Sequence, residues 1–224
     1  MGPSAVLIVC YATAAVTSTP LDQHLFGNTP GATLRLFNAT VGMTLSEWKA
    51  LPSPPGLPAQ VTAECEPGGG SSVVKPSAGP VQVTPNTLIC SYGTRYGKIW
   101  LQQSLPINRR YLADNIKYAF SNERLIGIQF LTSIDAFSDV VALIKAAYGP
   151  PTEKIRDFAP RYDGMRLPRV RMNWQLKGGT IYLVDPAARP DDLAVEISAR
   201  DAGGSSLIQT TVRPVSAKRS DERR

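Results

Sequence analysis

Residues 118–151 constrain the fold of this chain more than any other stretch, because they read as strand, turn, strand, helix and stop. The apolar run at 125–131 is too short for a separate helix, and its Ile and Phe content favours a strand. Polar residues at 121–124 form a plausible hairpin turn back to a strand that ends at 120. The rest of the chain can be arranged around this unit.

The helix in this stretch is predicted because apolar residues recur at steps of three and four and therefore share one face. These residues are Phe137, Val140, Val141, Ile144, Ala147 and Tyr148. Ser133 or Asp135 can cap the start of the helix by accepting a free backbone N–H. Gly149 can adopt the left-handed conformation that ends a helix, and Pro150 and Pro151 prevent its continuation.

Residues 169–177 alternate strictly between apolar and polar side chains, which predicts a half-buried strand. Gly178 and Gly179 indicate a hairpin, and further strands at 180–184 and 193–197 complete an antiparallel meander. We expect the apolar face of this meander, with Trp174 at its centre, to pack against the helix face that carries Ile144.

An earlier segment, residues 44–52, predicts a shorter helix. Thr44 and Glu47 have the spacing of a capping box, and Pro52 ends the helix after about two turns. Trp48 lies on the predicted inward face of this helix, which favours a core position over a ligand-stacking role. The predicted core is therefore Trp48, Phe137, Val140, Val141, Ile144, Tyr148 and Trp174.

These patterns predict an α+β fold with two helix-plus-antiparallel-sheet units in tandem and the helices packed on one face of the sheet. The globular domain spans 34–202, with candidate halves at 34–103 and 104–202. Two segments, 53–86 and 152–168, are expected to be irregular because proline, glycine or charged residues interrupt them.

The flanking segments predict export. Residues 1–16 are apolar and rich in alanine, as in a cleaved signal, residues 17–33 form a leader, and residues 203–224 form a disordered basic tail. The run that ends at Cys10 is a weak lipobox, and the bulky Val9 argues against lipidation. We therefore expect a periplasmic or secreted protein without a transmembrane span in its mature chain.

Loss of the signal leaves two cysteines, Cys65 and Cys90, which predicts a disulfide in an oxidising compartment. The alternative is a pair of buried thiols in a cytosolic protein.

No residue pattern indicates a catalytic, cofactor-binding or metal-binding site. The single histidine, His24, lies in the leader, outside the predicted core. Asp185, Asp191 and Asp192 supply oxygen ligands that calcium would accept, but their spacing matches no known loop motif and favours solvated turn acids. We therefore expect the protein to bind no cofactor.

A candidate interaction surface is cationic and consists of Arg161, Arg166, Arg169 and Arg171. It could meet an acidic envelope protein or an anionic surface, whereas the alternative is an edge strand protected from aggregation by charge. The net charge of +6 owes about half to the basic tail, so the composition argues against nucleic acid as the partner.

Residues 42–48, 148–151 and 181–183, together with Trp174, resemble small exported proteins of Gram-negative bacteria, most of unknown function. More distantly, the doubled helix-on-sheet pattern is similar to the β-lactamase-inhibitor-protein class and the SmpA/OmlA class of outer-membrane lipoproteins. The resemblance implies an envelope protein with an interaction fold and carries over no catalytic residue. Two function classes follow: a non-enzymatic interaction or scaffold protein of unknown partner, or a periplasmic hydrolase that uses carboxylates.

Overall fold

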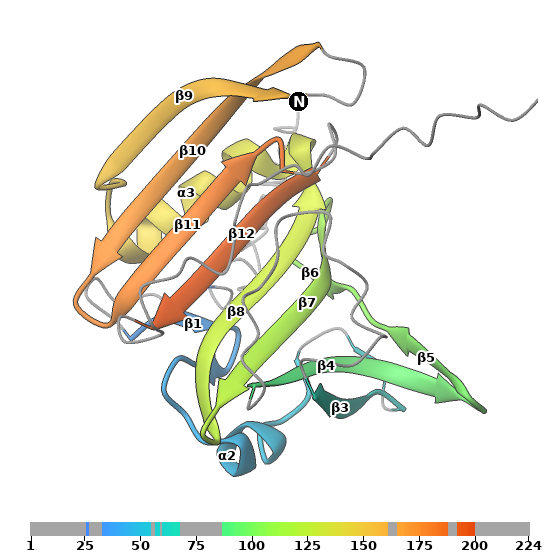
Figure 1. Cartoon of the computed structure of the whole chain (residues 1–224). Coiled ribbons are helices and arrows are strands. Elements are labelled where there is room, and N and C mark those ends of the chain that lie inside the picture. The colour runs from blue at the N-terminus through green and yellow to red at the C-terminus, as the bar shows by residue number, and fades with distance from the viewer. Residues whose placement is uncertain are drawn as a thin grey trace, which may run out of the picture.

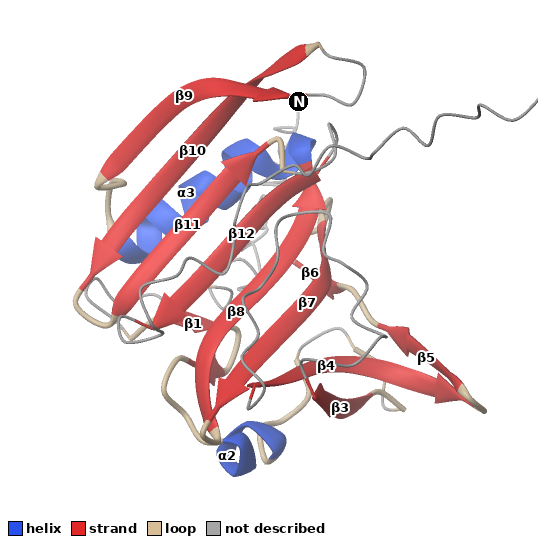
Figure 2. Ribbon diagram, viewed as in Figure 1, coloured by secondary structure: helices blue, strands red, loops and turns tan. Residues whose placement is uncertain are grey.

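The computed structural model describes residues 26, 33–54, 57–58, 60–67, 87–160, 165–187 and 192–199. The first half of this part contains β1 (Arg35–Leu36), β2 (Ala39–Thr40), α2 (Leu45–Lys49), β3 (Thr62–Pro67), β4 (Thr87–Tyr96), β5 (Ile99–Gln102) and β6 (Leu105–Pro106). The second half contains β7 (Leu112–Ser121), β8 (Arg124–Ser133), the 3-10 helix η1 (Ile134–Ala136), α3 (Phe137–Tyr148), β9 (Glu153–Pro160), β10 (Arg166–Leu176), β11 (Gly179–Asp185) and β12 (Asp192–Ala199). Figure 2 shows that strands dominate.

A single ten-stranded antiparallel sheet organises the molecule (Figure 1). Its path is β3-β4-β7-β8-β12-β11-β10-β9, with β5 paired to β4 and β6 paired to β7. The predicted fold of two tandem helix-plus-sheet units is therefore wrong, and the protein is largely β. The sheet runs through both candidate halves, because β4 pairs with β7. In addition, α2 has only five residues, too few to cover a sheet of its own.

Two strands lie in segments that the sequence predicts to be irregular. β9 pairs with β10 over eight residue pairs, from Asn173↔Glu153 to Arg166↔Pro160. Charged residues occupy half of β9, as is common on edge strands, and this hides its strand character from a hydrophobic pattern. β3 likewise lies within residues 53–86 and pairs with β4.

α3 has the bounds that its apolar periodicity suggests, and Gly149 ends it with a φ of 84°. Its start differs from the expectation, because Ser133 caps η1 and α3 follows without a side-chain cap. Ile144 and Trp174 lie in the same buried cluster, and the Trp174 indole donates a hydrogen bond of 2.9 Å to the Gly149 carbonyl. Six of the seven predicted core residues are buried, and Phe137 is partly buried against them.

Phe26 places part of the predicted leader in the core. Its side chain is 2% exposed, and its ring centroid lies 6.5 Å from that of Phe130 and 6.4 Å from that of Tyr148. The Tyr148 hydroxyl donates a hydrogen bond of 3.0 Å to the Phe26 carbonyl. The predicted signal segment, the rest of the leader apart from Thr33, and the basic tail lie outside the described residues.

Candidate functional site

β4 changes its partner part way along one edge, and the sheet forks there (Figure 1). Residues 87–90 of β4 pair with β7, whereas residues 93–96 pair with β5. The chain continues from β5 into β6, which pairs with the far end of β7. The β4–β5 hairpin therefore diverges from β6 and β7, and a cleft of about 440 Å³ lies in the fork.

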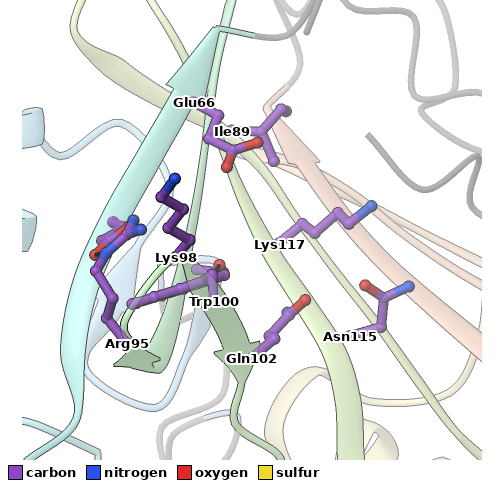
Figure 3. Close-up of a pocket in the computed structure, with 10 residues that line it drawn as sticks. Glu66, Ile89, Arg95, Lys98, Trp100, Gln102, Asn115 and Lys117 are labelled. Atoms are coloured by element: carbon purple, nitrogen blue, oxygen red, sulfur yellow. Dashed lines mark hydrogen bonds and ion pairs between the residues drawn. The ribbon is translucent and has the colours of Figure 1, made fainter. Parts of the chain in front are cut away.

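Charged and amide side chains and one indole line this cleft, which we call the fork cleft. The lining residues are Glu64, Glu66, Ile89, Ser91, Arg95, Lys98, Trp100, Gln102, Asn115 and Lys117. Figure 3 shows Arg95, Lys98 and Trp100 on the hairpin side and Asn115 and Lys117 on the β7 side. The cleft thus brings together groups from β3, β4, β5 and β7 that are far apart in the sequence.

Trp100 forms a fixed wall of the fork cleft. A side chain at Gly93 would meet the Trp100 ring at 2.5 Å, so only glycine allows the ring to lie this close to β4. The indole nitrogen lies 3.3 Å from the Ser91 hydroxyl, to which it donates a hydrogen bond. The Arg95 guanidinium lies 5.7 Å from the ring centroid, and it forms a fork-shaped ion pair with Glu64, whose carboxylate is thereby occupied.

Lys117 is the unusual group on the opposite wall. Its side chain is 9% exposed, and burial lowers the pKa of its ammonium below the ordinary value. A register shift lies between Asp114 and Lys117, with a φ of 51° at Asn115, and both Asn115 and Lys117 line the cleft. Lys117 has no ion-pair partner within the described part of the chain.

Gln102 closes the base of the fork, where β5 and β7 separate. Its side-chain amide donates a hydrogen bond of 2.6 Å to the Ile116 carbonyl and so links β5 to β7, which share no backbone pairing among the described residues. The Arg95–Glu64 pair is internally neutral, which leaves Lys98, Lys117 and Glu66 as the lining charges without an ion pair among the described residues. The fork cleft is therefore a cationic, partly aromatic site that suits an acidic ligand.

The predicted arginine surface lies at the far end of the sheet, and Asp157 of β9 organises it. Arg169 donates two hydrogen bonds of 2.8 Å to the Asp157 carboxylate, and Arg171 donates one of 2.6 Å. These contacts lower the pKa of Asp157 to about 2. Arg166 lies over the Phe158 ring at 5.2 Å, and Arg161 is outside the described residues. The role of these arginines as an interaction surface stays a prediction.

The predicted disulfide between Cys65 and Cys90 is confirmed. It joins directly opposed residues of β3 and β4, whose Cα atoms are 4.0 Å apart. Because successive side chains on β3 alternate between faces, Cys65 points away from the face that carries Glu64 and Glu66. The crosslink therefore fixes the strand that supplies both carboxylates without entering the cleft.

The histidine and aspartates considered in the sequence as catalytic or metal-binding groups do not come together in the described part of the structure. His24 and Asp191 lie outside the described residues, and no group of three or more metal-ligating side chains occurs in the part that the structure describes. Asp185 and Asp192 belong to β11 and β12, and burial raises the pKa of Asp185. No helix among the described residues is both long and apolar enough to cross a membrane.

Sequence reasoning missed the fork cleft. The available signal was the mixture of basic and aromatic residues around the turn at 95–100, where Arg95, Lys98 and Trp100 gather at the tip of a hairpin. Lys117 gave no such signal, because it reads as an ordinary polar position of a strand. Comparison of the chain with family models, curated proteins and solved structures finds no match.

Proposed function

We propose that this protein is a non-enzymatic binding protein and that the fork cleft holds an acidic partner. The observation that carries the proposal is Lys117, a nearly buried cation that lines the cleft and forms no ion pair with another described residue. A buried charge is costly unless it is paired, and an anionic ligand would supply the missing partner. Lys98 and the Trp100 ring add a second cation and an apolar surface beside it.

The alternative, a hydrolase that uses two carboxylates, finds less support in the same cleft. Its two carboxylates, Glu64 and Glu66, come from one strand, so they do not face each other across a substrate. Glu64 is also engaged by Arg95 through both of its oxygens. A general acid or base must be free to exchange a proton with the substrate, which Glu64 in this pair is not.

We further propose that the protein acts in the periplasm or outside the cell. The disulfide between Cys65 and Cys90 supports this location, because such bonds persist in oxidising compartments. The alanine-rich start of the chain is consistent with an export signal. The proposed function is thus an interaction or scaffold role in the envelope or the secreted fraction.

Fluorescence titration with a hexaglutamate peptide tests the proposal, with a hexalysine peptide as the control. Because Trp48 and Trp174 are buried, the response should come from Trp100 and should vanish in Trp100→Phe. We expect saturable binding of hexaglutamate that weakens as salt is added. Lys117→Gln should weaken this binding by about tenfold, because a desolvated cation interacts strongly with an anion.

Glu66→Gln is the matched control, because it neutralises a lining residue whose charge is opposite to that of Lys117. It removes an acidic group from the same lining, so binding of hexaglutamate should strengthen rather than weaken. Equal binding of both peptides, or binding of neither, would contradict the proposed function. So would a Glu66→Gln variant that loses binding, because the carboxylate would then be a required ligand group.

A further inference from the structure

Four described strands of the sheet, β3, β5, β6 and β9, pair with another described strand on one side only, and their free edges differ in how they are protected. β6 has only two residues, one of which is Pro106. The β9 edge carries charged residues, among them Glu153, Lys154 and Arg156. The β3 edge carries Glu64, Glu66 and Pro67. Charges and proline on edge strands normally prevent pairing with other chains. The four residues of β5, Ile-Trp-Leu-Gln, contain neither.

The outer edge of β5 has backbone groups with which no described strand pairs. Gly97, with a φ of 60°, and Lys98 form the two-residue turn of the β4–β5 hairpin. In such a hairpin Tyr96 and Ile99 bond to each other, and Trp100 and Gln102 direct their N–H and C=O groups away from β4. The bond from the Gln103 N–H to the Tyr92 carbonyl fits this register. Within the described part of the chain, no strand pairs with this edge.

The two faces of β5 differ sharply in character. Ile99 and Leu101 lie on one face and are 62% and 49% exposed, and Tyr96, opposite Ile99, is 58% exposed. Trp100 and Gln102 lie on the other face, which lines the fork cleft with Lys98 and Lys117. A strand added beside β5 would therefore meet an exposed apolar surface on one face and cations on the other.

From these features we infer that β5 binds an extended peptide segment of a partner protein by strand addition, with acidic and apolar residues alternating along the segment. This inference rests on the proposed function and specifies how the acidic partner is held. Main-chain bonds to Trp100 and Gln102 supply affinity, and the alternating side chains supply specificity. The acidic residues face Lys98 and Lys117, and the apolar residues cover Ile99 and Leu101.

The spacing of the two lysines sets the spacing of the acidic residues. Lys98 precedes β5 at the hairpin tip, and Lys117 lines the cleft on the β7 side. The length of β5 from residue 98 to residue 102 is about 13 Å at about 3.3 Å per residue. Two acidic residues four positions apart in the added strand would therefore reach from the tip to the base of the fork.

Binding of defined peptides to the full chain tests the inference. The probe is an octapeptide of alternating glutamate and valine, compared with one of the same composition that has four glutamates followed by four valines. The alternating peptide should bind about tenfold more tightly, because only it places acidic and apolar groups on separate faces. Ile99→Lys should abolish this advantage, whereas Leu112→Lys, at an exposed leucine of β7, should leave it unchanged.

Amide methylation of the peptide isolates the main-chain bonds. Methyl groups on one alternate set of its amides should weaken binding by about tenfold or more, and methyl groups on the other set should have little effect. Equal effects of both sets, with hexaglutamate still bound, would overturn strand addition and leave the proposed function standing. Failure of every acidic peptide would overturn both. A dimer of the free chain that Ile99→Lys dissociates in sedimentation would replace the partner peptide with a second copy and overturn the inference.

Discussion

The three tryptophans of this chain occupy different environments, and their substitution should separate stability from binding. Trp48 and Trp174 are buried, whereas Trp100 is partly exposed in the fork cleft. Trp174→Ala should lower the free energy of unfolding by about 3–5 kcal/mol, because it leaves a cavity and removes a bond to Gly149. That is a large share of a total stability of about 5–15 kcal/mol.

Urea denaturation monitored by circular dichroism measures this loss, and Trp100→Ala is its matched control. The control should cost about 1 kcal/mol or less, as expected for a residue outside the core. If Trp174→Ala unfolded at the wild-type midpoint while Trp100→Ala was strongly destabilised, the assignment of core and cleft would be reversed.

Single residues were predictable from the sequence where a periodic pattern governs them. The alternation around Trp174 and the spacing around Ile144 each mark a buried face. Lys117 could not be recognised, because its burial depends on a register shift in β7 and on the packing of neighbouring strands, neither of which leaves a local pattern. The conformation of Asn115 at this shift is likewise a consequence of tertiary structure.

The β3–β4 pair is held by a crosslink, and its stability should depend on oxidation. The disulfide joins residues 25 positions apart, and the chain-entropy estimate for a loop of that length is about 3 kcal/mol. A Cys65→Ala/Cys90→Ala variant should therefore unfold with a free energy lower by about this amount. Urea titration of the oxidised protein and the variant measures the difference.

Labelling of free thiols in the unfolded, unreduced protein controls this comparison. Neither Cys65 nor Cys90 should react before a reductant is added. Two reactive thiols, or identical urea midpoints for the oxidised protein and the variant, would show that the crosslink does not contribute in the native protein.

Elements were predictable when their own residues decided them. The capping box of α2 forms, with Glu47 and Thr44 each accepting the other's backbone N–H, and Gly149 ends α3. The turn before β8 adopts positive φ at Asn122 and Glu123. In contrast, β9 has only weak apolar alternation, because an edge strand is stabilised by its pairing with β10 and not by a buried face of its own.

The whole molecule should unfold as one cooperative unit, because one sheet and one large buried cluster connect its two predicted halves. Trp48 packs against Tyr118 and Phe120 of β7, at ring-centroid distances of 5.0 Å and 5.5 Å. The same buried cluster extends to Trp174. Urea unfolding curves from far-ultraviolet circular dichroism and from tryptophan fluorescence should therefore coincide.

Trp48→Phe and Trp174→Phe variants make the comparison specific to each half, since each leaves the other buried tryptophan as a reporter. In each variant, the urea midpoint from tryptophan fluorescence should equal the midpoint from circular dichroism. Two separate midpoints would show that residues 34–103 and 104–202 unfold independently.

The overall topology was not predictable, because it depends on long-range pairing. The repeat pattern of strand, helix and loop suggested two separate sheets, but the pairing of β4 with β7 joins them. The fork depends on the same choice, since β4 can pair with β5 only where β7 has moved away. A local sequence pattern does not specify such a division of one strand between two partners.

The position of Phe26 limits where the amino-terminal segment could be cut without loss of a core side chain. Its ring lies between Phe130 and Tyr148, and its carbonyl accepts the Tyr148 hydroxyl bond. A protease that cut after residue 26 would remove a core side chain and leave a buried tyrosine with one fewer acceptor. Any peptidase acting on the amino-terminal segment must therefore cut ahead of Phe26, and folding around this residue would shield the chain beyond it from further digestion.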